Sequence, residues 1–271
     1  MPMDVIARNN VKVFGNGTQP MVFAHGFGCD QNMWRHITPA FQDDYRIVLF
    51  DYVGAGKSDL QAYDAERYST LEGYAQDITE ILEALDLRDV ILVGHSVSSM
   101  ISVLAARAAG DRVSRLIMVG PSPRYINDGD QYVGGFERAD IEGLLEMMDK
   151  NYIGWANFLA PAIIKNPDQP ELAGELTESF CSTDPVIARR FAEATFFADN
   201  RQDLASVRVP SLILQCSDDI IAPLAVGEYL HKNVPGSTLR VMKATGHCPH
   251  MSHPEETIEL IQEYLQADLA A

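Results

Sequence analysis

Residues 90–109 read VILVGHSVSSMISVLAARAA, and this stretch decides the fold. It opens with a short continuous apolar run, which is typical of a strand buried on both faces. It closes with a helical pattern rich in small residues, Val97–Ala109. Between the two lies GHSVS at 94–98, which matches G-x-S-x-G except at its last position, Ser98. The stretch therefore predicts a buried strand, a sharp turn and a helix.

Similar short β-rich runs and helical patterns alternate along the rest of the core. Strands are predicted at 11–14, 21–24, 45–50, 116–119, 211–215 and 238–242. Helices are predicted from Ser69 onward, at 224–233 and at 254–266. Ser69 and Glu72 fit a capping box at the start of the first of these helices. Buried strands that alternate with helices predict an α/β fold, with a mostly parallel sheet and helices on both faces.

Residues 121–205 interrupt this alternation, because they contain helix-like segments and no convincing strand. We therefore expect a core of residues 1–120 and 206–271 with an inserted helical lid of residues 121–205. The lid is rich in aromatic residues, which either pack its helices together or line an apolar pocket above the sheet. The expected pocket residues are Phe27, Tyr125, Phe136, Trp155, Phe158 and Phe196.

Ser96 is the candidate nucleophile, because a sharp strand-to-helix turn lifts its hydroxyl above the sheet edge. An unactivated serine is a poor nucleophile and needs a base. In hydrolases with this turn, an acidic residue and then a histidine follow on loops after late strands. His247 fits the general base, and Asp219, four residues before Pro223, fits the residue that orients it. Asp218 is the rival for the acidic role.

Two backbone N–H groups are candidates for an oxyanion hole. The sequence HGFG at 25–28 follows a predicted strand, and its glycines allow the backbone to turn sharply and approach a ligand. The N–H of Phe27, together with that of Val97, can stabilise a tetrahedral intermediate. His95 precedes the nucleophile and is expected to point away from its hydroxyl, so we predict only a packing role for it.

Other chemistries are disfavoured. The cluster of His247, Cys248, His250 and His253 suggests zinc, but no second ligand pair appears at a familiar spacing, so we expect no metal and no cofactor. The chain carries 21 basic and 38 acidic residues, a net charge of −17. Such a surface repels nucleic acids and anionic membranes. The longest apolar stretch, 158–164, is too short to span a bilayer.

The cysteines and the N-terminal residues predict a cytoplasmic protein. The four cysteines are widely spaced and form no C-x-x-C pair, which favours reduced thiols. Residues 1–4 have no basic start and no apolar segment, so no secretory signal is expected.

The chain resembles the α/β-hydrolases, and more closely the RsbQ-like regulators of the bacterial sigma-B stress response, which are related to plant karrikin and strigolactone receptors. The similar stretches span nearly the whole chain: HGFGCD at 25–30, FDYVG at 50–54, GHSV at 94–97, LLEMM at 144–148, NYIGW at 151–155, FCSTDP at 180–185 and GHCPHMSH at 246–253. At Ser98 and Ser99 the chain departs from RsbQ and is similar to the plant receptors.

The resemblance implies an active Ser96–Asp219–His247 triad, an oxyanion hole at Phe27 and Val97, and an apolar cavity under a four-helix lid. It also implies action with a PAS-domain serine/threonine phosphatase similar to RsbP. The leading hypothesis is a carboxylesterase-like serine hydrolase that acts in signalling on a small apolar ester- or lactone-like molecule. The alternatives are a housekeeping carboxylesterase without a protein partner and a ligand-binding module with a vestigial triad. The intact serine, aspartate and histidine disfavour the last.

Overall fold

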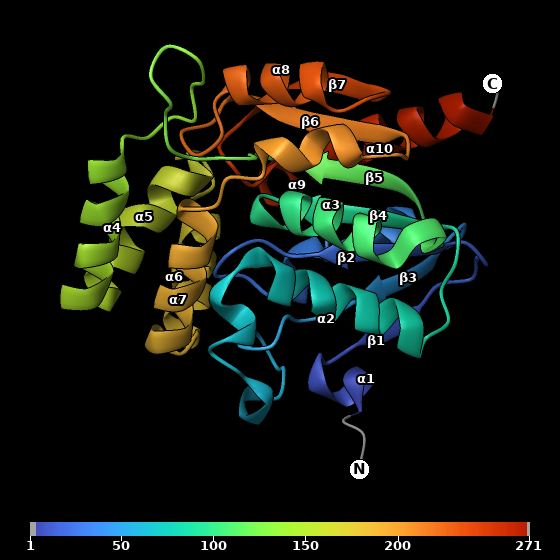
Figure 1. The fold of residues 1–271 in the computed structure, drawn as a ribbon, viewed down its shortest axis with the longest axis horizontal. Helices are drawn as coiled ribbons and strands as arrows, with labels where there is room; N and C mark the ends of the chain where they lie inside the picture. The colour runs from blue at the N-terminus through green and yellow to red at the C-terminus, as the bar shows by residue number, and fades with distance from the viewer. Residues whose placement is uncertain (1–3, 270–271) are drawn as a thin grey trace.

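A seven-stranded sheet forms the centre of the protein in a computed structural model that describes residues 4–269 (Figure 1). The strand order is β1-β3-β2-β4-β5-β6-β7. β1 pairs antiparallel with β3, and every other neighbouring pair is parallel. The strands are β1 (Lys12–Phe14), β2 (Pro20–Ala24), β3 (Arg46–Leu49), β4 (Val90–His95), β5 (Val113–Val119), β6 (Ser211–Asp218) and β7 (Ser237–Thr245).

Helices cover both faces of this sheet, which confirms the predicted α/β class. α2, α3 and α8 lie on the face toward the viewer in Figure 1, and α10 lies behind the sheet. The helices are α1 (Val5–Arg8), α2 (Leu71–Ala84), α3 (Val97–Ala109), α4 (Arg138–Lys150), α5 (Tyr152–Ile164), α6 (Pro170–Ser182), α7 (Pro185–Phe196), α8 (Leu224–Asn233), α9 (Pro249–Ser252) and α10 (Pro254–Leu269).

The central strands are apolar throughout because successive side chains enter two different cores. In β2, Met21 and Phe23 belong to the core that includes Ile261 of α10. Val22 belongs to the core that includes Ile78 of α2 and residues of α3. Neighbouring side chains of a strand point to opposite faces, so a strand covered on both sides is apolar at every position.

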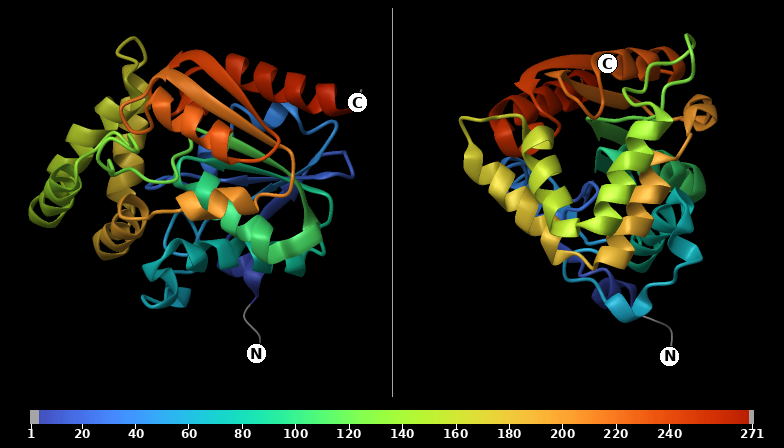
Figure 2. Two further views of the ribbon diagram at one scale, coloured as in Figure 1. Left: turned by 45° about the horizontal axis from the view of Figure 1, so that its top comes forward. Right: turned by 90° about the vertical axis from the view of Figure 1, so that its left-hand side faces the viewer.

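Four helices, α4–α7, lie between β5 and β6 in the sequence and form a layer at one end of the sheet (Figure 2). We call them the helical insertion. The insertion touches the loop after β7, because the His247 N–H donates to the Ile163 carbonyl over 2.8 Å. The carboxyl ends of parallel strands are where open α/β sheets bind ligands, so the insertion covers the edge at which a site is expected.

Several element boundaries differ from the sequence prediction. The capping box at Ser69 is wrong: α2 begins at Leu71, Thr70 is its N-cap, and the Ser69 hydroxyl donates to the Glu66 carbonyl. β5 begins at Val113, three residues earlier than predicted. α1 was not predicted; it is four residues long, and the Asp4 carboxylate caps it.

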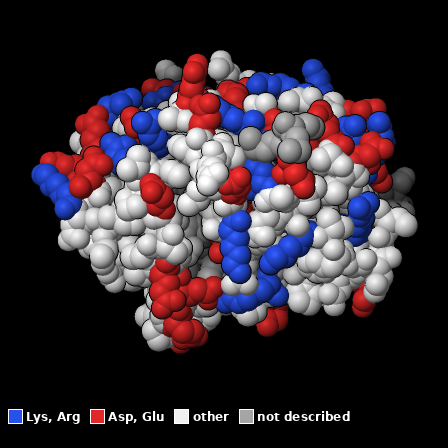
Figure 3. Space-filling model, turned by 90° about the horizontal axis from the view of Figure 1, so that it is seen from below, with Lys and Arg blue, Asp and Glu red and all other residues white. Residues whose placement is uncertain are grey.

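The protein surface carries charges of both signs. On the face seen from below, groups of acidic and basic side chains alternate, with uncharged surface around them (Figure 3). Among residues 4–269, no helix has the length and apolar character needed to cross a membrane. Residues 1–3, part of the stretch from which no secretory signal is expected, lie outside the described residues.

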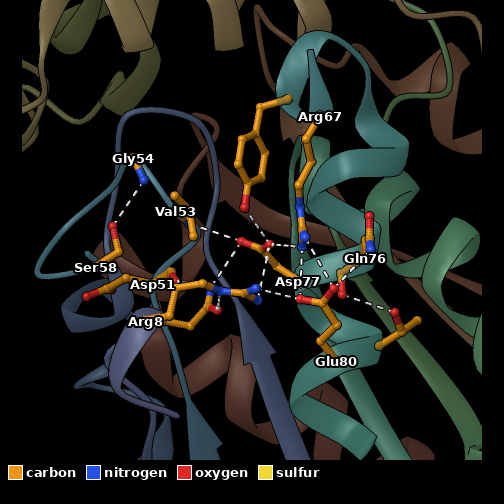
Figure 4. Close-up of polar contacts among 12 residues, drawn as sticks. Arg8, Asp51, Val53, Gly54, Ser58, Arg67, Gln76, Asp77 and Glu80 are labelled. Carbon is orange, nitrogen blue, oxygen red and sulfur yellow. Dashed lines mark hydrogen bonds and ion pairs between the residues drawn. The ribbon is translucent and has the colours of Figure 1, made fainter. Parts of the chain in front are cut away.

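A buried polar cluster joins α1 and α2 to the loop that follows β3 (Figure 4). At its centre is the Asp77 carboxylate on α2, which is fully buried. It accepts hydrogen bonds from the Arg67 guanidinium over 2.6 Å and from the Val53 N–H over 3.0 Å. Glu80, one turn further along α2, pairs with Arg8 over 2.6 Å. We call this group the Asp77 cluster; it fixes the backbone just after Tyr52.

Candidate active site

Ser96 is the single residue that links β4 to α3, and its backbone conformation is strained. Its φ is 57° and its ψ is −125°, a region that non-glycine residues rarely occupy. Its N–H donates to the Val119 carbonyl at the end of β5 over 2.8 Å. At Gly94, a Cβ atom would lie 2.5 Å from the Ser98 carbonyl oxygen, so strand and helix approach this closely only with glycine there.

The structure brings Ser96, His247 and Asp219 into one hydrogen-bonded array. The Ser96 Oγ lies 2.7 Å from the His247 Nε2, and the His247 Nδ1 lies 2.6 Å from the Asp219 Oδ2. All three side chains are buried. An imidazole in this position can take the hydroxyl proton, while the carboxylate holds the ring in the tautomer that leaves Nε2 free to accept it.

Asp219 is itself held by backbone donors. Its Oδ1 accepts from the N–H groups of Ile221 and Ala222 over 2.8 and 3.2 Å, which leaves Oδ2 for the histidine. Asp218, the rival for the acidic role, forms an ion pair with Lys165, and its side chain is 58% exposed. The two neighbouring aspartates therefore occupy entirely different surroundings.

Phe27 lines the same cavity as Ser96, and Val97 follows Ser96 directly in the chain. Val97 is the first residue of α3, so its N–H has no acceptor within the helix. Phe27 follows Gly26, where a Cβ would lie 2.5 Å from the His95 Nδ1. No residue in the described part of the chain accepts a hydrogen bond from the Phe27 N–H. Two free N–H groups beside a nucleophile can bind a developing oxyanion.

The packing role predicted for His95 is incomplete. Its Nε2 lies 2.7 Å from the His247 carbonyl oxygen, and because a carbonyl can only accept, the imidazole donates. Burial lowers the pKa of His95, so the ring stays neutral. His95 thus fixes the backbone of the loop that carries His247. The sequence held no signal for this contact, since the partner lies 152 residues away.

A small apolar cavity opens beside the Ser96 hydroxyl. Its volume is about 30 Å³. Among the residues predicted from the sequence, Phe27, Tyr125 and Phe196 line it. The Tyr125 hydroxyl lies 3.5 Å from the Ser96 Oγ. The lining also includes residues that no sequence pattern indicated: Cys29, Ile163, Leu176, Phe180, Thr195, Ile221 and Cys248.

Three of the predicted pocket residues do not line this cavity. The prediction for Phe158 is wrong, because its side chain is 59% exposed. The buried face of α5 is centred on Ala156 and Ile163, and Phe158 lies on the opposite side of the helix. Trp155 instead packs behind the cavity, with its ring centroid 5.0 Å from that of Phe180. Phe136 is half-buried, and its N–H donates to the Tyr125 carbonyl over 3.1 Å.

The other members of the histidine-rich stretch do not converge with His247 on a common point. His250 is fully buried between the rings of Trp34 and His95, with centroid distances of 4.7 and 4.3 Å. His253 lies 2.9 Å from the Ser252 hydroxyl through its Nδ1. In residues 4–269, no group of three or more histidine, cysteine, aspartate or glutamate side chains is arranged to hold a metal ion.

Burial of His250 makes the stability of the protein depend on pH. Burial, with Arg35, His36 and His247 nearby, lowers the pKa of His250 to about 3. The unfolded chain binds a proton near pH 6.5 and the folded chain does not, so stability is full above that pH and is lost as the pH falls toward 3. We expect this histidine to reduce the unfolding free energy by about 1 kcal/mol between pH 6 and pH 5.

Urea denaturation of the His250→Phe variant at both pH values measures this contribution. Phenylalanine keeps the ring stacking and cannot take up the proton, so the variant should lose less stability than the wild type over this interval. His231→Phe is the control, because His231 is exposed and should keep the wild-type dependence. Equal pH dependence in the His250 variant and the wild type would contradict the assignment.

Comparisons with known proteins agree with this architecture. Residues 21–260 match the alpha/beta hydrolase family. The chain is 42% identical over 263 residues to the Karrikin insensitive 2 receptor CA of Petunia hybrida, covering 97% of each protein. It is 37% identical to the strigolactone esterase RMS3 of Pisum sativum, covering 90% of this chain and 92% of that one. A hydrolase from Oleispira antarctica superposes with a TM-score of 0.95 at 49% identity, covering 97% of this chain and 96% of that one. The chain therefore belongs to the alpha/beta hydrolase family.

Proposed function

We propose that this protein is a serine hydrolase in which Ser96 is the nucleophile, His247 the general base and Asp219 the residue that orients it. The observation that carries the proposal is the continuous array of short contacts, 2.7 Å from the Ser96 Oγ to the His247 Nε2 and 2.6 Å from the His247 Nδ1 to the Asp219 Oδ2. The strained backbone at Ser96 supports it, because strain of this kind concentrates at functional sites.

The reaction follows from the position of these groups. The Ser96 Oγ attacks the ester carbonyl carbon and its proton passes to the His247 Nε2. The carbonyl oxygen becomes an oxyanion that accepts hydrogen bonds from the Phe27 and Val97 N–H groups. The bond to the alcohol oxygen then breaks, and the imidazolium returns its proton to the departing alcohol. Water repeats the sequence on the acyl-enzyme, releasing the acid and restoring the Ser96 hydroxyl.

The substrate that this site suits is a small apolar ester or lactone. The cavity volume of about 30 Å³ leaves room for a short acyl group. Its walls are mainly aromatic and aliphatic, and the hydroxyl of Tyr125 is one polar group near the nucleophile. The name of a relative, strigolactone esterase, supports the same class of substrate.

Phe196 is expected to limit the length of the acyl group. The Phe196→Ala variant should raise kcat/KM for p-nitrophenyl octanoate relative to the acetate by about tenfold, because each methylene that gains a buried position contributes about 0.8 kcal/mol. Phe158→Ala is the matched control, since this phenylalanine is exposed on α5 and should leave the ratio unchanged. The comparison is made from steady-state rates on the two esters. An unchanged ratio in the Phe196 variant would mean that this ring does not bound the acyl site.

The decisive experiment for the proposed function is covalent labelling. Treatment with a small fluorophosphonate should add one phosphonyl group, which peptide mass spectrometry should locate on Ser96. The Ser96→Ala variant should gain no mass. A wild-type protein that hydrolyses no ester and gains no adduct would overturn the proposal and leave the ligand-binding module as the explanation.

We further propose that hydrolysis serves a regulatory role, acting with a PAS-domain serine/threonine phosphatase in a sigma-B-type stress response. Support comes from the RsbQ-like stretches and from relatives named as karrikin receptors. The alternative is a housekeeping carboxylesterase with the same chemistry and no protein partner. The four cysteines are free thiols, which favours the cytoplasm as the site of action.

A reconstituted assay separates the two roles. A PAS-domain phosphatase from the same organism is assayed with and without the hydrolase and a slowly hydrolysed ester. A change in phosphatase activity that requires the intact hydrolase supports signalling. No effect, together with rapid turnover of one metabolite, supports the housekeeping role.

A further inference from the structure

Ser98 replaces the last glycine of the G-x-S-x-G pattern, and its hydroxyl has two partners outside its own helix. The side chain is fully buried. Its Oγ lies 2.5 Å from the His25 carbonyl oxygen and 2.8 Å from the Tyr52 hydroxyl. A carbonyl oxygen can only accept, so Ser98 donates to His25 and the Tyr52 hydroxyl donates to Ser98. The helix that begins beside the nucleophile is thereby tied to the strand end that precedes Phe27.

Tyr52 also contacts His25 directly, through its backbone. Its N–H donates to the His25 Nε2 over 3.2 Å. The proton of this neutral ring is then on Nδ1, which donates to the Gly26 carbonyl oxygen over 2.9 Å. Burial lowers the pKa of His25, which keeps the ring in this single-proton form.

The Gly26 carbonyl controls the direction of the Phe27 N–H, because the two groups belong to one planar peptide unit. In a trans peptide the C=O and N–H point in opposite directions. The Gly26 carbonyl oxygen also accepts from the Cys29 N–H over 3.3 Å. A carbonyl held from two sides therefore fixes the direction of the Phe27 N–H.

Tyr52 is itself rigidly placed. Its ring is fully buried and packs edge-on against His25 and Phe50, with centroid distances of 4.9 and 5.0 Å. The next residue, Val53, donates its N–H to the Asp77 carboxylate over 3.0 Å, as Figure 4 shows. The Asp77 cluster thus anchors Tyr52, the first donor in the series of hydrogen bonds that runs from Tyr52 through Ser98 to His25. Linked hydrogen bonds of this kind polarise and strengthen one another in a buried setting.

We propose that Ser98 and Tyr52 are positioning residues for the oxyanion hole, acting through His25 on the N–H of Phe27. The inference rests on the proposed serine hydrolase function, because it concerns the donor to the tetrahedral intermediate. Neither residue lines the cavity beside Ser96. Ser98 stands where the motif has its last glycine, and its hydroxyl thus has a function that glycine could not supply.

The test compares Ser98→Ala, Tyr52→Phe and the double variant in hydrolysis of p-nitrophenyl acetate and in inhibition by a small boronic acid. The boronate forms a tetrahedral adduct on the nucleophile, so its affinity reports on the oxyanion hole. We expect Ser98→Ala to lower kcat about tenfold, a fraction of the roughly 10²–10³-fold loss when an oxyanion donor is removed outright. KM should change less than about twofold, since bound substrate does not yet carry the charge.

The boronate should bind more weakly by the same factor as kcat falls. Tyr52→Phe should act in the same direction, and the double variant should be no worse than Ser98→Ala, because both changes break one chain of hydrogen bonds. Ser102→Ala is the matched control. Ser102 is buried on the same helix, and its hydroxyl has no hydrogen-bond partner in the described part of the chain, so its loss should leave kcat and boronate affinity unchanged.

Three results would overturn the inference. Wild-type kcat and boronate affinity in Ser98→Ala would show that the hydroxyl positions nothing, and the hydrolase proposal would stand. A lower kcat with unchanged boronate affinity would place the effect outside the oxyanion hole. A wild-type protein with neither turnover nor a fluorophosphonate adduct would remove the proposed function itself. If Ser98→Ala does not fold, Tyr52→Phe is judged by the same two measurements.

Discussion

Replacement of Asp219 by asparagine is expected to lower kcat for a short ester by about 10⁴-fold, as in other serine–histidine–aspartate systems. The Asp219 Oδ2 accepts from the His247 Nδ1 over 2.6 Å. An asparagine amide at this position would offer a hydrogen to Nδ1, so the ring would carry its proton on Nε2. Nε2 could then no longer accept the proton of Ser96. KM should stay near the wild-type value, because substrate binding does not use this carboxylate.

Asp218→Asn is the matched control for this prediction. The two aspartates are adjacent in the sequence, but Asp218 is 58% exposed and pairs with Lys165 at the surface. Its replacement should leave kcat within about twofold of the wild type, since an exposed ion pair contributes little. Steady-state kinetics on p-nitrophenyl acetate distinguish the two variants. Equal losses in both variants would contradict the assignment of Asp219.

The sequence predicted those parts of the fold that depend on local patterns. α3 and α8 begin and end at the predicted residues, Val97–Ala109 and Leu224–Asn233. Each follows a clear boundary, a strand-to-helix turn before the first and Pro223 before the second. The turn at 94–98 also predicted the position of Ser96 on its loop, because that motif describes a backbone geometry as well as a residue type.

Contacts between distant segments could not be predicted from the sequence. The hydrogen bond from His95 to the His247 carbonyl and the one from Ser98 to the His25 carbonyl each join residues more than 70 positions apart. No periodicity or spacing encodes such a pair. In the sequence, Ser98 is only a departure from the last glycine of the motif, because its hydrogen-bond partners can be identified only in the folded chain.

The pocket residues show a second limit of sequence patterns. Phe158 and Phe196 are both phenylalanines of the helical insertion, yet one is 59% exposed and the other 7% exposed. Composition indicates that aromatic residues are plentiful there, but helix rotation decides which of them face the cavity. α5 is so apolar that its exposed side cannot be recognised from hydrophobic spacing alone.

Removal of the Asp77 side chain is expected to cause a large loss of stability. The carboxylate is fully buried, and its two oxygens accept from Arg67 and Tyr68 on one side and from Asn9 and Val53 on the other. Burying charges is unfavourable unless they are paired and hydrogen-bonded. Asp77→Ala would leave these donors without their common acceptor.

We expect Asp77→Ala to lower the unfolding free energy by about 3–5 kcal/mol, the range found when one partner of a buried ion pair is removed. Urea denaturation followed by circular dichroism measures the change. Glu146→Ala is the control, because its ion pair with Lys150 is exposed on α4 and its loss should leave the denaturation midpoint unchanged. A loss below about 1 kcal/mol in Asp77→Ala would mean that Glu80 alone satisfies both arginines of the cluster. In that case the backbone after Tyr52 would have to be held by its ring packing and not by the Asp77 carboxylate.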